Sequence, residues 1–185
     1  TTREGGAVWT GTLPDGTAVP GANHCDDWTK TSLSTLGHYG FVTKDGVLFT
    51  GDALYQRDLW KKHPLPYAID PGMVVASLER IAATQCLWIV PAHGRPIPRE
   101  KADSDLAFHI AQVYEIFDLL VSGLRNGLST EQAVAYVSEK RGLVGNPASY
   151  WLAVTTVKGY LGELLHRGEI EFEVRDHAGW WHAVV

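Results

Sequence analysis

Two polar residues of this chain stand directly after short apolar runs, where their side chains could bind a metal ion. Asp52 follows residues 47–50 and a glycine, and His93 follows residues 86–90 and a Pro-Ala pair. Strand ends are rigid while the loops beyond them leave room for a substrate, so such side chains can converge at one place. A carboxylate and an imidazole suit a hard or borderline cation. The pair therefore predicts part of a metal site.

The elements that would position these residues have the local order strand, helix, strand. Lys44-Asp45-Gly46 lies between the β-prone runs 37–43 and 47–50, and Asp-Gly in that setting predicts a hairpin. Residues 73–83 space their apolar side chains as one face of a helix. Residues 86–90 form a continuous apolar run of the length of a buried strand. Asp52 and His93 would thus each follow a strand.

A second pattern begins after residues 96–101, where two prolines and a charge cluster indicate a domain boundary. We expect one domain over residues 1–100 and another over 101–185. Residues 106–124 carry a broad apolar stripe that predicts a helix. Ser129-Thr130-Glu131-Gln132 is a capping box that would open a second helix.

The end of the chain predicts a third helix and a hairpin. Asn146-Pro147 is an N-cap followed by Pro at the first helical position, and the helix would run over 148–166 to the glycine at 168. Residues 169–174 alternate as an edge strand does, and 180–184 would return after a turn. Three helices followed by a hairpin describe a winged-helix domain.

Composition sets limits on the protein class. The chain has 185 residues, 45% of them hydrophobic, a formal charge of -5 and only two cysteines, which is ordinary for a globular protein without a disulfide framework. Neither an apolar run near 18 residues nor a secretory signal is seen, so we expect a cytoplasmic protein with no membrane partner. Residues 103–185 hold eleven acidic and six basic residues, which argues against a nucleic-acid partner.

Several of these segments together resemble a known family. Gly37-His38-Tyr39-Gly40-Phe41, the segment from Asp45 to Leu54 around Gly51-Asp52, the Ser-Leu pair at 77–78 and Pro91-Ala92-His93-Gly94 are similar in order and spacing to the C-terminal half of the metallo-beta-lactamase fold. The resemblance spans residues 31–98. It implies an α+β fold, half of an αββα sandwich, and residues 103–185 are similar to the winged-helix domain that follows this fold in several branches.

The resemblance also implies roles for individual residues. Asp52 would bridge two metal ions as the catalytic carboxylate, and His93 would bind the second ion. The third family histidine falls at Ser34 in an ungapped alignment, and a hydroxyl is a poor ligand beside imidazole. An insertion would let His24 supply this ligand instead, and the sequence leaves both readings open. His38 is expected next to the site, as a substrate contact rather than a ligand.

The strongest signature of the family, His-x-His-x-Asp-His, stands nowhere in this chain, although the chain has eight histidines. The segment before residue 31 is too short for the first sheet of the sandwich. We therefore expect the N-terminal half on a partner polypeptide, on a precursor, or on the remainder of a fragmented chain. The aromatic residues Trp151, Trp180 and Trp181 are expected in the core of the small domain.

Two functions follow from these observations. The first is a metal-dependent hydrolase that uses Zn²⁺, one ion or two, with Fe or Mn as alternatives, and whose metal-bound hydroxide attacks a small-molecule ester, thioester, lactone, amide or phosphodiester. It would be active only when the other half is present. The alternative is a binding or scaffold protein that retains part of the fold without catalysis. Ser34 favours the scaffold, whereas Asp52 and His93 favour the hydrolase.

Overall fold

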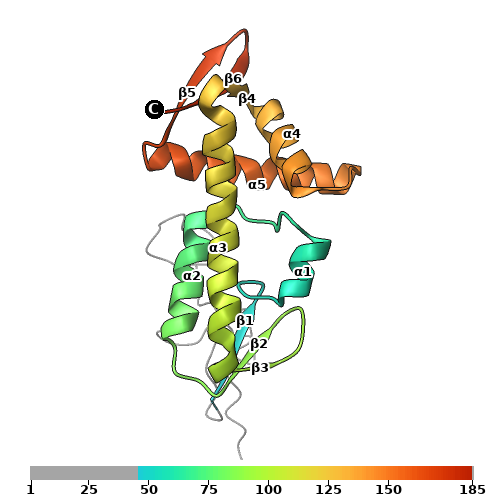
Figure 1. The fold of residues 1–185 in the computed structure, drawn as a ribbon, viewed down its shortest axis with the longest axis vertical. Helices are drawn as coiled ribbons and strands as arrows, with labels where there is room; N and C mark the ends of the chain where they lie inside the picture. Colours follow the sequence, from blue (N-terminus) through green and yellow to red (C-terminus); the bar gives the residue numbers. More distant parts are fainter. Residues whose placement is uncertain (1–45, 185) are drawn as a thin grey trace, which may run out of the picture.

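The computed structural model of the chain describes residues 46–184. The predicted first strand of the hairpin, at 37–43, lies outside this range, as do His24, Ser34 and His38. The described chain is elongated, with a sheet at one end, a small helical unit at the other, and one long helix joining them (Figure 1).

The first unit confirms the predicted order of strand, helix and strand. Its elements are β1 (Val47–Gly51), α1 (Arg57–Lys62), α2 (Pro71–Ala83), β2 (Trp88–Pro91) and β3 (Ile97–Pro98). The strands form a sheet of order β1-β2-β3, in which β1 and β2 run parallel and β3 runs antiparallel to β2. Helix α2 begins two residues earlier than predicted, because the Asp70 side chain accepts a hydrogen bond from the Met73 backbone N–H and Pro71 occupies the first turn.

The two faces of this sheet differ in burial. Leu48, Ile89 and Ile97 are buried and pack with residues of α2 and α3. Phe49 and Trp88 belong to the opposite face, since side chains alternate along a strand, and they are 50% and 44% exposed. One face of the sheet is therefore core, while the other presents large apolar side chains to solvent.

The long helix α3 (Arg99–Gly123) begins seven residues before the predicted start. The Arg99 guanidinium donates hydrogen bonds to Asp103, one turn later, and to the Ala82 carbonyl. The charged residues that predicted a domain boundary therefore form the first turn of this helix. Ala102 and Leu106 pack into the core beneath the sheet, and residues from Val113 onward pack into the second core. The predicted boundary between residues 100 and 101 therefore lies within the first turn of one continuous helix.

Among the described residues one helix, Arg99–Asn126, has the length and apolar composition that a membrane crossing requires. A core helix of a folded domain meets the same test. Helix α3 contacts α2, α4 and α5 through its buried face and exposes Glu115 and Asp118 on the other. Of its most apolar 18-residue window, 33% is buried within the described structure, so packing in this chain covers part of its apolar residues.

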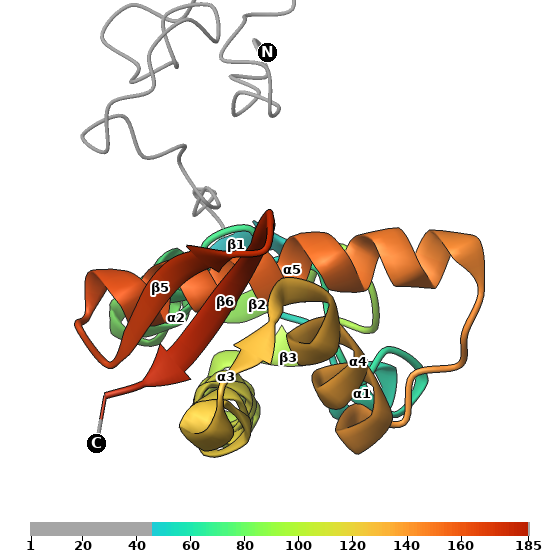
Figure 2. The same cartoon turned by 90° about the horizontal axis from the view of Figure 1, so that it is seen from above.

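The second unit contains β4 (Leu128–Ser129), α4 (Thr130–Arg141), α5 (Pro147–His166), β5 (Ile170–Arg175) and β6 (Ala178–Ala183). The strands form a sheet of order β4-β6-β5, which lies beside α5 (Figure 2). The predicted capping box at Ser129 and Gln132 is present, and the Asn146 side chain caps α5 through the Ser149 N–H. The three predicted helices and the hairpin are thus confirmed as elements.

The expectation of a core position is wrong for two of the three tryptophans, since Trp180 is only partly buried and is not among the residues that pack against the core. Trp151 is 66% exposed in the first turns of α5 and is not part of the core of the small unit. Trp181 does pack against that core, and its indole N–H donates to the Thr130 hydroxyl. Tyr160, Leu161 and Leu164 of α5 fill the core instead.

Candidate metal centre

The carboxyl ends of β1 and β2 meet side by side, and this places Asp52 next to His93. Gly51 is in register with Pro91, and the Ala92 N–H donates to the Gly51 carbonyl at 2.9 Å. The backbone therefore continues to pair one residue beyond β2. His93 Nε2 lies 3.4 Å from Asp52 Oδ1, so the structure brings together the two residues that the sequence singled out.

Both side chains are open to solvent, at 77% exposure for Asp52 and 69% for His93. Contacts between such exposed groups contribute little to stability, because water screens them and their side chains lose entropy on pairing. The fold therefore does not depend on this pair. Their arrangement, one oxygen donor and one nitrogen donor facing the same space, is the donor chemistry that zinc accepts.

The donor set of the described residues is incomplete. A catalytic zinc site uses three protein ligands and a water molecule. Within residues 46–184, no group of three His, Cys, Asp or Glu side chains is placed to hold one ion. Asp52 and His93 by themselves therefore do not form a complete catalytic zinc site among the described residues.

Glycines give the two loops of the site their shape. Gly51 and Gly94 adopt φ of +55° and +120°, conformations that side chains disfavour. A Cβ on Gly94 would lie 2.9 Å from Gln56 Cγ. The Gln56 amide donates to the Arg95 carbonyl at 3.3 Å, so the loop after β1 is tied to the loop that carries His93.

An aromatic cluster lies next to the Asp52 loop and was not expected from the sequence. The Tyr55 and His109 rings meet edge to face at 4.2 Å, and Trp60 packs 5.1 Å from His109. Burial raises the pKa of the Tyr55 hydroxyl well above its ordinary value, and the Tyr160 hydroxyl and the Asp52 carboxylate raise it further. The Tyr55 hydroxyl is therefore neutral, and the negative charge of the Asp52 carboxylate acts on it.

His109 is the buried member of this cluster. Burial lowers the pKa of its imidazole to about 4, against a smaller opposing effect of Asp105. Its Nδ1 and the Trp60 indole Nε1 are buried with no hydrogen-bond partner among the described residues. Sequence reasoning left His109 without a role, although its place three residues after Leu106 and four before Val113 is on the apolar face of α3.

The remaining predicted site residues, His24 and His38, and the alternative Ser34, lie outside the described residues. Cys86 is partly buried, and burial raises the pKa of its thiol, which disfavours the thiolate that binds metal.

Comparison with known proteins supports the fold. The chain is similar to a metallo-beta-lactamase family protein from Thermus thermophilus, with a TM-score of 0.60 and 17% identity over 80% of this chain. It is also similar to a beta-lactamase domain protein from Burkholderia ambifaria, with a TM-score of 0.53 and 19% identity over 76% of this chain. No family model and no curated protein matches the sequence.

These neighbours define a class of fold. The chain is a mixed helix and sheet protein that resembles part of the fold of these metallo-beta-lactamase family proteins. It spans less than half of the length of the two solved structures, 46% of one and 42% of the other. More than half of each neighbour therefore has no counterpart in this chain.

Proposed function

We propose that the chain is the C-terminal half of a metal-dependent hydrolase of metallo-beta-lactamase type. Residues 1–100 would belong to the αββα sandwich, and residues 101–185 would form a winged-helix domain. The observation that carries the proposal is the 3.4 Å approach of His93 to Asp52 at the ends of two parallel strands, within a fold similar to that of known family members. Helices α3, α4 and α5 followed by the β5–β6 hairpin support the second domain.

The metal in this proposal is Zn²⁺, one ion or two, with Fe or Mn as alternatives. Asp52 can contact two cations because a carboxylate has two oxygens, and His93 supplies a nitrogen ligand. The bound ion would provide a hydroxide nucleophile at neutral pH for a small ester, thioester, lactone, amide or phosphodiester. His24 remains the proposed third ligand and His38 the proposed substrate contact.

The completing half would lie on the open face of the sheet. Phe49 and Trp88 are half exposed on the face opposite the helices, and large apolar patches of this kind mark interaction surfaces. The chain accounts for under half of its structural neighbours, which supports a missing segment of similar size. We propose that this segment carries the His-x-His-x-Asp-His motif.

A second candidate is a scaffold that kept the fold without catalysis. The observation that favours it is the small donor set, since within residues 46–184 no group of three possible ligands forms around Asp52 and His93. The two proposals differ in whether the assembled protein holds metal at these residues.

Metal analysis of the native material, together with a mass measurement for a co-purifying chain, tests the hydrolase. Asp52→Asn should abolish hydrolysis and remove at least one ion per molecule, because the amide keeps the shape but loses the charge that offsets two dications. His93→Ala should remove one ion preferentially. Matched controls are Asp118→Asn and His63→Ala, which change exposed residues of α3 and the end of α1.

The controls should retain full metal content and activity. Unchanged metal content in both Asp52→Asn and His93→Ala would reject the hydrolase and leave the scaffold in its place. The variants Ser34→Ala and His24→Ala separate the two candidates for the third ligand. Metal affinity should fall only when the residue that binds the metal is replaced.

A further inference from the structure

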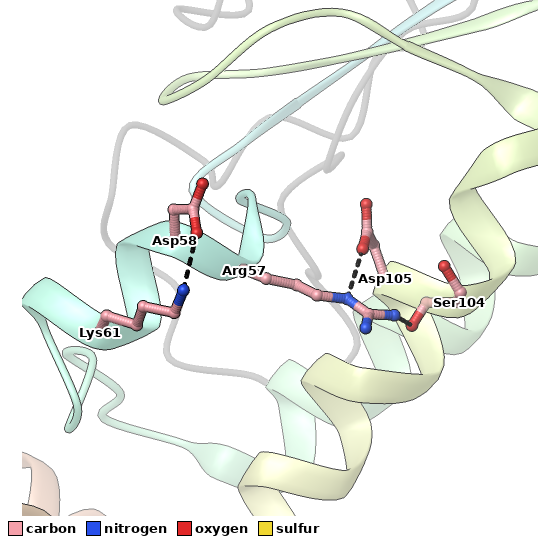
Figure 3. A network of polar contacts seen from close by, with 5 residues as sticks. All are labelled: Arg57, Asp58, Lys61, Ser104 and Asp105. Atoms are coloured by element: carbon pink, nitrogen blue, oxygen red, sulfur yellow. Dashed lines mark hydrogen bonds and ion pairs between the residues drawn. The ribbon is translucent and has the colours of Figure 1, made fainter.

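An open surface cavity of about 400 Å³ lies between α1 and α3, on residues other than Asp52 and His93. Its volume falls in the range of small-molecule sites. The lining residues are Arg57, Asp58, Trp60, Lys61, Phe108 and Gln112. Figure 3 shows Arg57, one of the lining residues, reaching from α1 toward Ser104 and Asp105 of α3.

The apolar walls of the cavity are two aromatic rings held at a fixed angle. Trp60 and Phe108 meet edge to face, with ring centroids 6.1 Å apart and an interplanar angle of 88°. Trp60 belongs to the main core, so its ring cannot turn away without disturbing that core. Trp60 is only 6% exposed, so a flat apolar ligand would contact the partly exposed Phe108 ring and the small exposed part of Trp60, at little cost in side-chain entropy.

The first cation of the cavity is oriented before any ligand arrives. Arg57 Nε donates to Asp105 Oδ1 at 2.7 Å, and its Nη2 donates to the Ser104 carbonyl (Figure 3). The guanidinium carbon lies 5.0 Å from the centre of the Phe108 ring. These two bonds use part of a fork of five N–H donors, so the others remain for an acceptor. Because Asp105 offsets the charge of Arg57, selection here rests on directed hydrogen bonds rather than on net charge.

The second cation, Lys61, is 81% exposed at the rim, and its described partner is Asp58 at 3.3 Å. An exposed pair three residues apart on a helix contributes little to stability, because water screens it. The ammonium group can therefore leave Asp58 for a ligand at little cost. The cavity thus combines a fixed donor, a mobile cation and two aromatic walls.

We propose that this cavity binds an organic anion that has a flat apolar body and an anionic oxygen group. Arg57 and Lys61 hold the oxygens, and the body lies against Phe108 and the small exposed part of Trp60. The cavity is near the candidate metal centre, since Gln56, the neighbour of Arg57, bonds to the Arg95 carbonyl in the loop of His93. The proposal does not depend on hydrolysis, because binding here requires neither the metal nor the other half.

The test measures binding of three probes to the full chain by isothermal titration. 2-Naphthoate carries both the flat body and the carboxylate, 2-naphthamide has the same shape without the charge, and acetate has the charge without the body. We expect saturable binding of 2-naphthoate, binding of 2-naphthamide at least about tenfold weaker, and no measurable binding of acetate.

Variants locate the site. Arg57→Gln and Phe108→Ala should each weaken 2-naphthoate binding by about tenfold or more, and Lys61→Gln should weaken it severalfold. Arg175→Gln is the matched control, because Arg175 also lies over an aromatic ring, that of Trp180 at 4.1 Å, in the distant β5–β6 hairpin. Its affinity for 2-naphthoate should be unchanged.

Lys61→Gln keeps the test decisive if Arg57→Gln fails to fold, because the exposed Lys61 side chain makes no contact in the core. Equal affinity for 2-naphthoate and 2-naphthamide would overturn the proposal. Full affinity for 2-naphthoate in both single variants, Lys61→Gln and Phe108→Ala, would also overturn it. The probe would then bind elsewhere, for example on the open sheet face at Phe49 and Trp88.

Discussion

At the scale of single residues, the burial of His109 makes the free energy of unfolding depend on pH. Its imidazole is buried beside Tyr55 and Trp60, and burial lowers its pKa to about 4 from an ordinary value of 6.5. The folded state therefore holds His109 neutral. The unfolded chain takes up a proton below about pH 6.5, so stability from this group is complete above that pH and falls as pH drops toward 4.

We predict that the free energy of unfolding falls by about 3 kcal/mol from this group between pH 7 and pH 4. His109→Phe should reduce this acid loss, because phenylalanine keeps a ring in the cluster and has no proton to bind. Urea unfolding of both proteins across this range measures it. His63→Phe, at an exposed position, is the control and should keep the parental pH dependence. An unchanged acid loss in His109→Phe would show that other groups cause it.

Of the residues around the candidate metal centre, the sequence could predict Asp52 and His93 but not His109. Asp52 and His93 were found because each follows an apolar run, and parallel pairing of β1 and β2 then brings them to 3.4 Å. The role of His109 could not be found in this way. Its burial depends on Tyr55 and Trp60, which come from a loop and a short helix about 50 residues away in the chain.

At the scale of elements, α5 contains two glycines with opposite surroundings. A Cβ on Gly159 would collide with the Ile69 carbonyl oxygen. Next to Ile69, the Ala68 N–H donates to the hydroxyl of Thr156, which is also in α5. A Cβ on Gly162 would meet nothing within 4 Å. Gly159 therefore allows the loop before α2 to approach α5, whereas Gly162 only weakens the helix.

We predict opposite effects of the same substitution at these two positions. Gly159→Ala should destabilise the protein by about 1–3 kcal/mol, because a backbone carbonyl cannot move aside as a flexible side chain can. Gly162→Ala should stabilise it by about 0.5–1 kcal/mol through helix propensity. Thermal or urea unfolding of both variants measures the difference. Equal effects of the two variants would mean that the loop is not packed against α5.

Elements with local signals were predictable, and those that depend on distant contacts were not. Ser129 and Asn146 mark the starts of α4 and α5 because the caps that they form are local. Helix α1 was not predicted. Its six residues are too few to be stable by themselves, and its buried Trp60 packs into a core built largely from residues beyond 110.

At the scale of the whole molecule, α3 connects two cores and the sheet leaves one face open. Val74 and Ile110 contact both cores, so the two units pack against each other and are not joined by a free linker. Phe49 and Trp88 on the open sheet face are among the large apolar residues that this packing leaves exposed.

We predict that the purified chain self-associates through this face. The double variant Phe49→Lys and Trp88→Lys should remove the association without loss of stability, because both side chains are about half exposed. Sedimentation velocity over a range of concentrations measures it. Val144→Lys is the control, since Val144 is a more exposed apolar residue in the loop before α5. Association that persists in the double variant would place the contact on another surface.

The last prediction concerns activity, which belongs to the assembled molecule. A catalytic zinc requires three protein ligands, and the described residues bring together two, both highly exposed. The 185-residue chain alone should therefore show no metal-dependent hydrolysis of ester, lactone or phosphodiester substrates. Activity should appear when a polypeptide with the His-x-His-x-Asp-His motif is added, and Asp52→Asn should prevent it. Metal-dependent hydrolysis by the purified chain alone would show that its own residues complete the site.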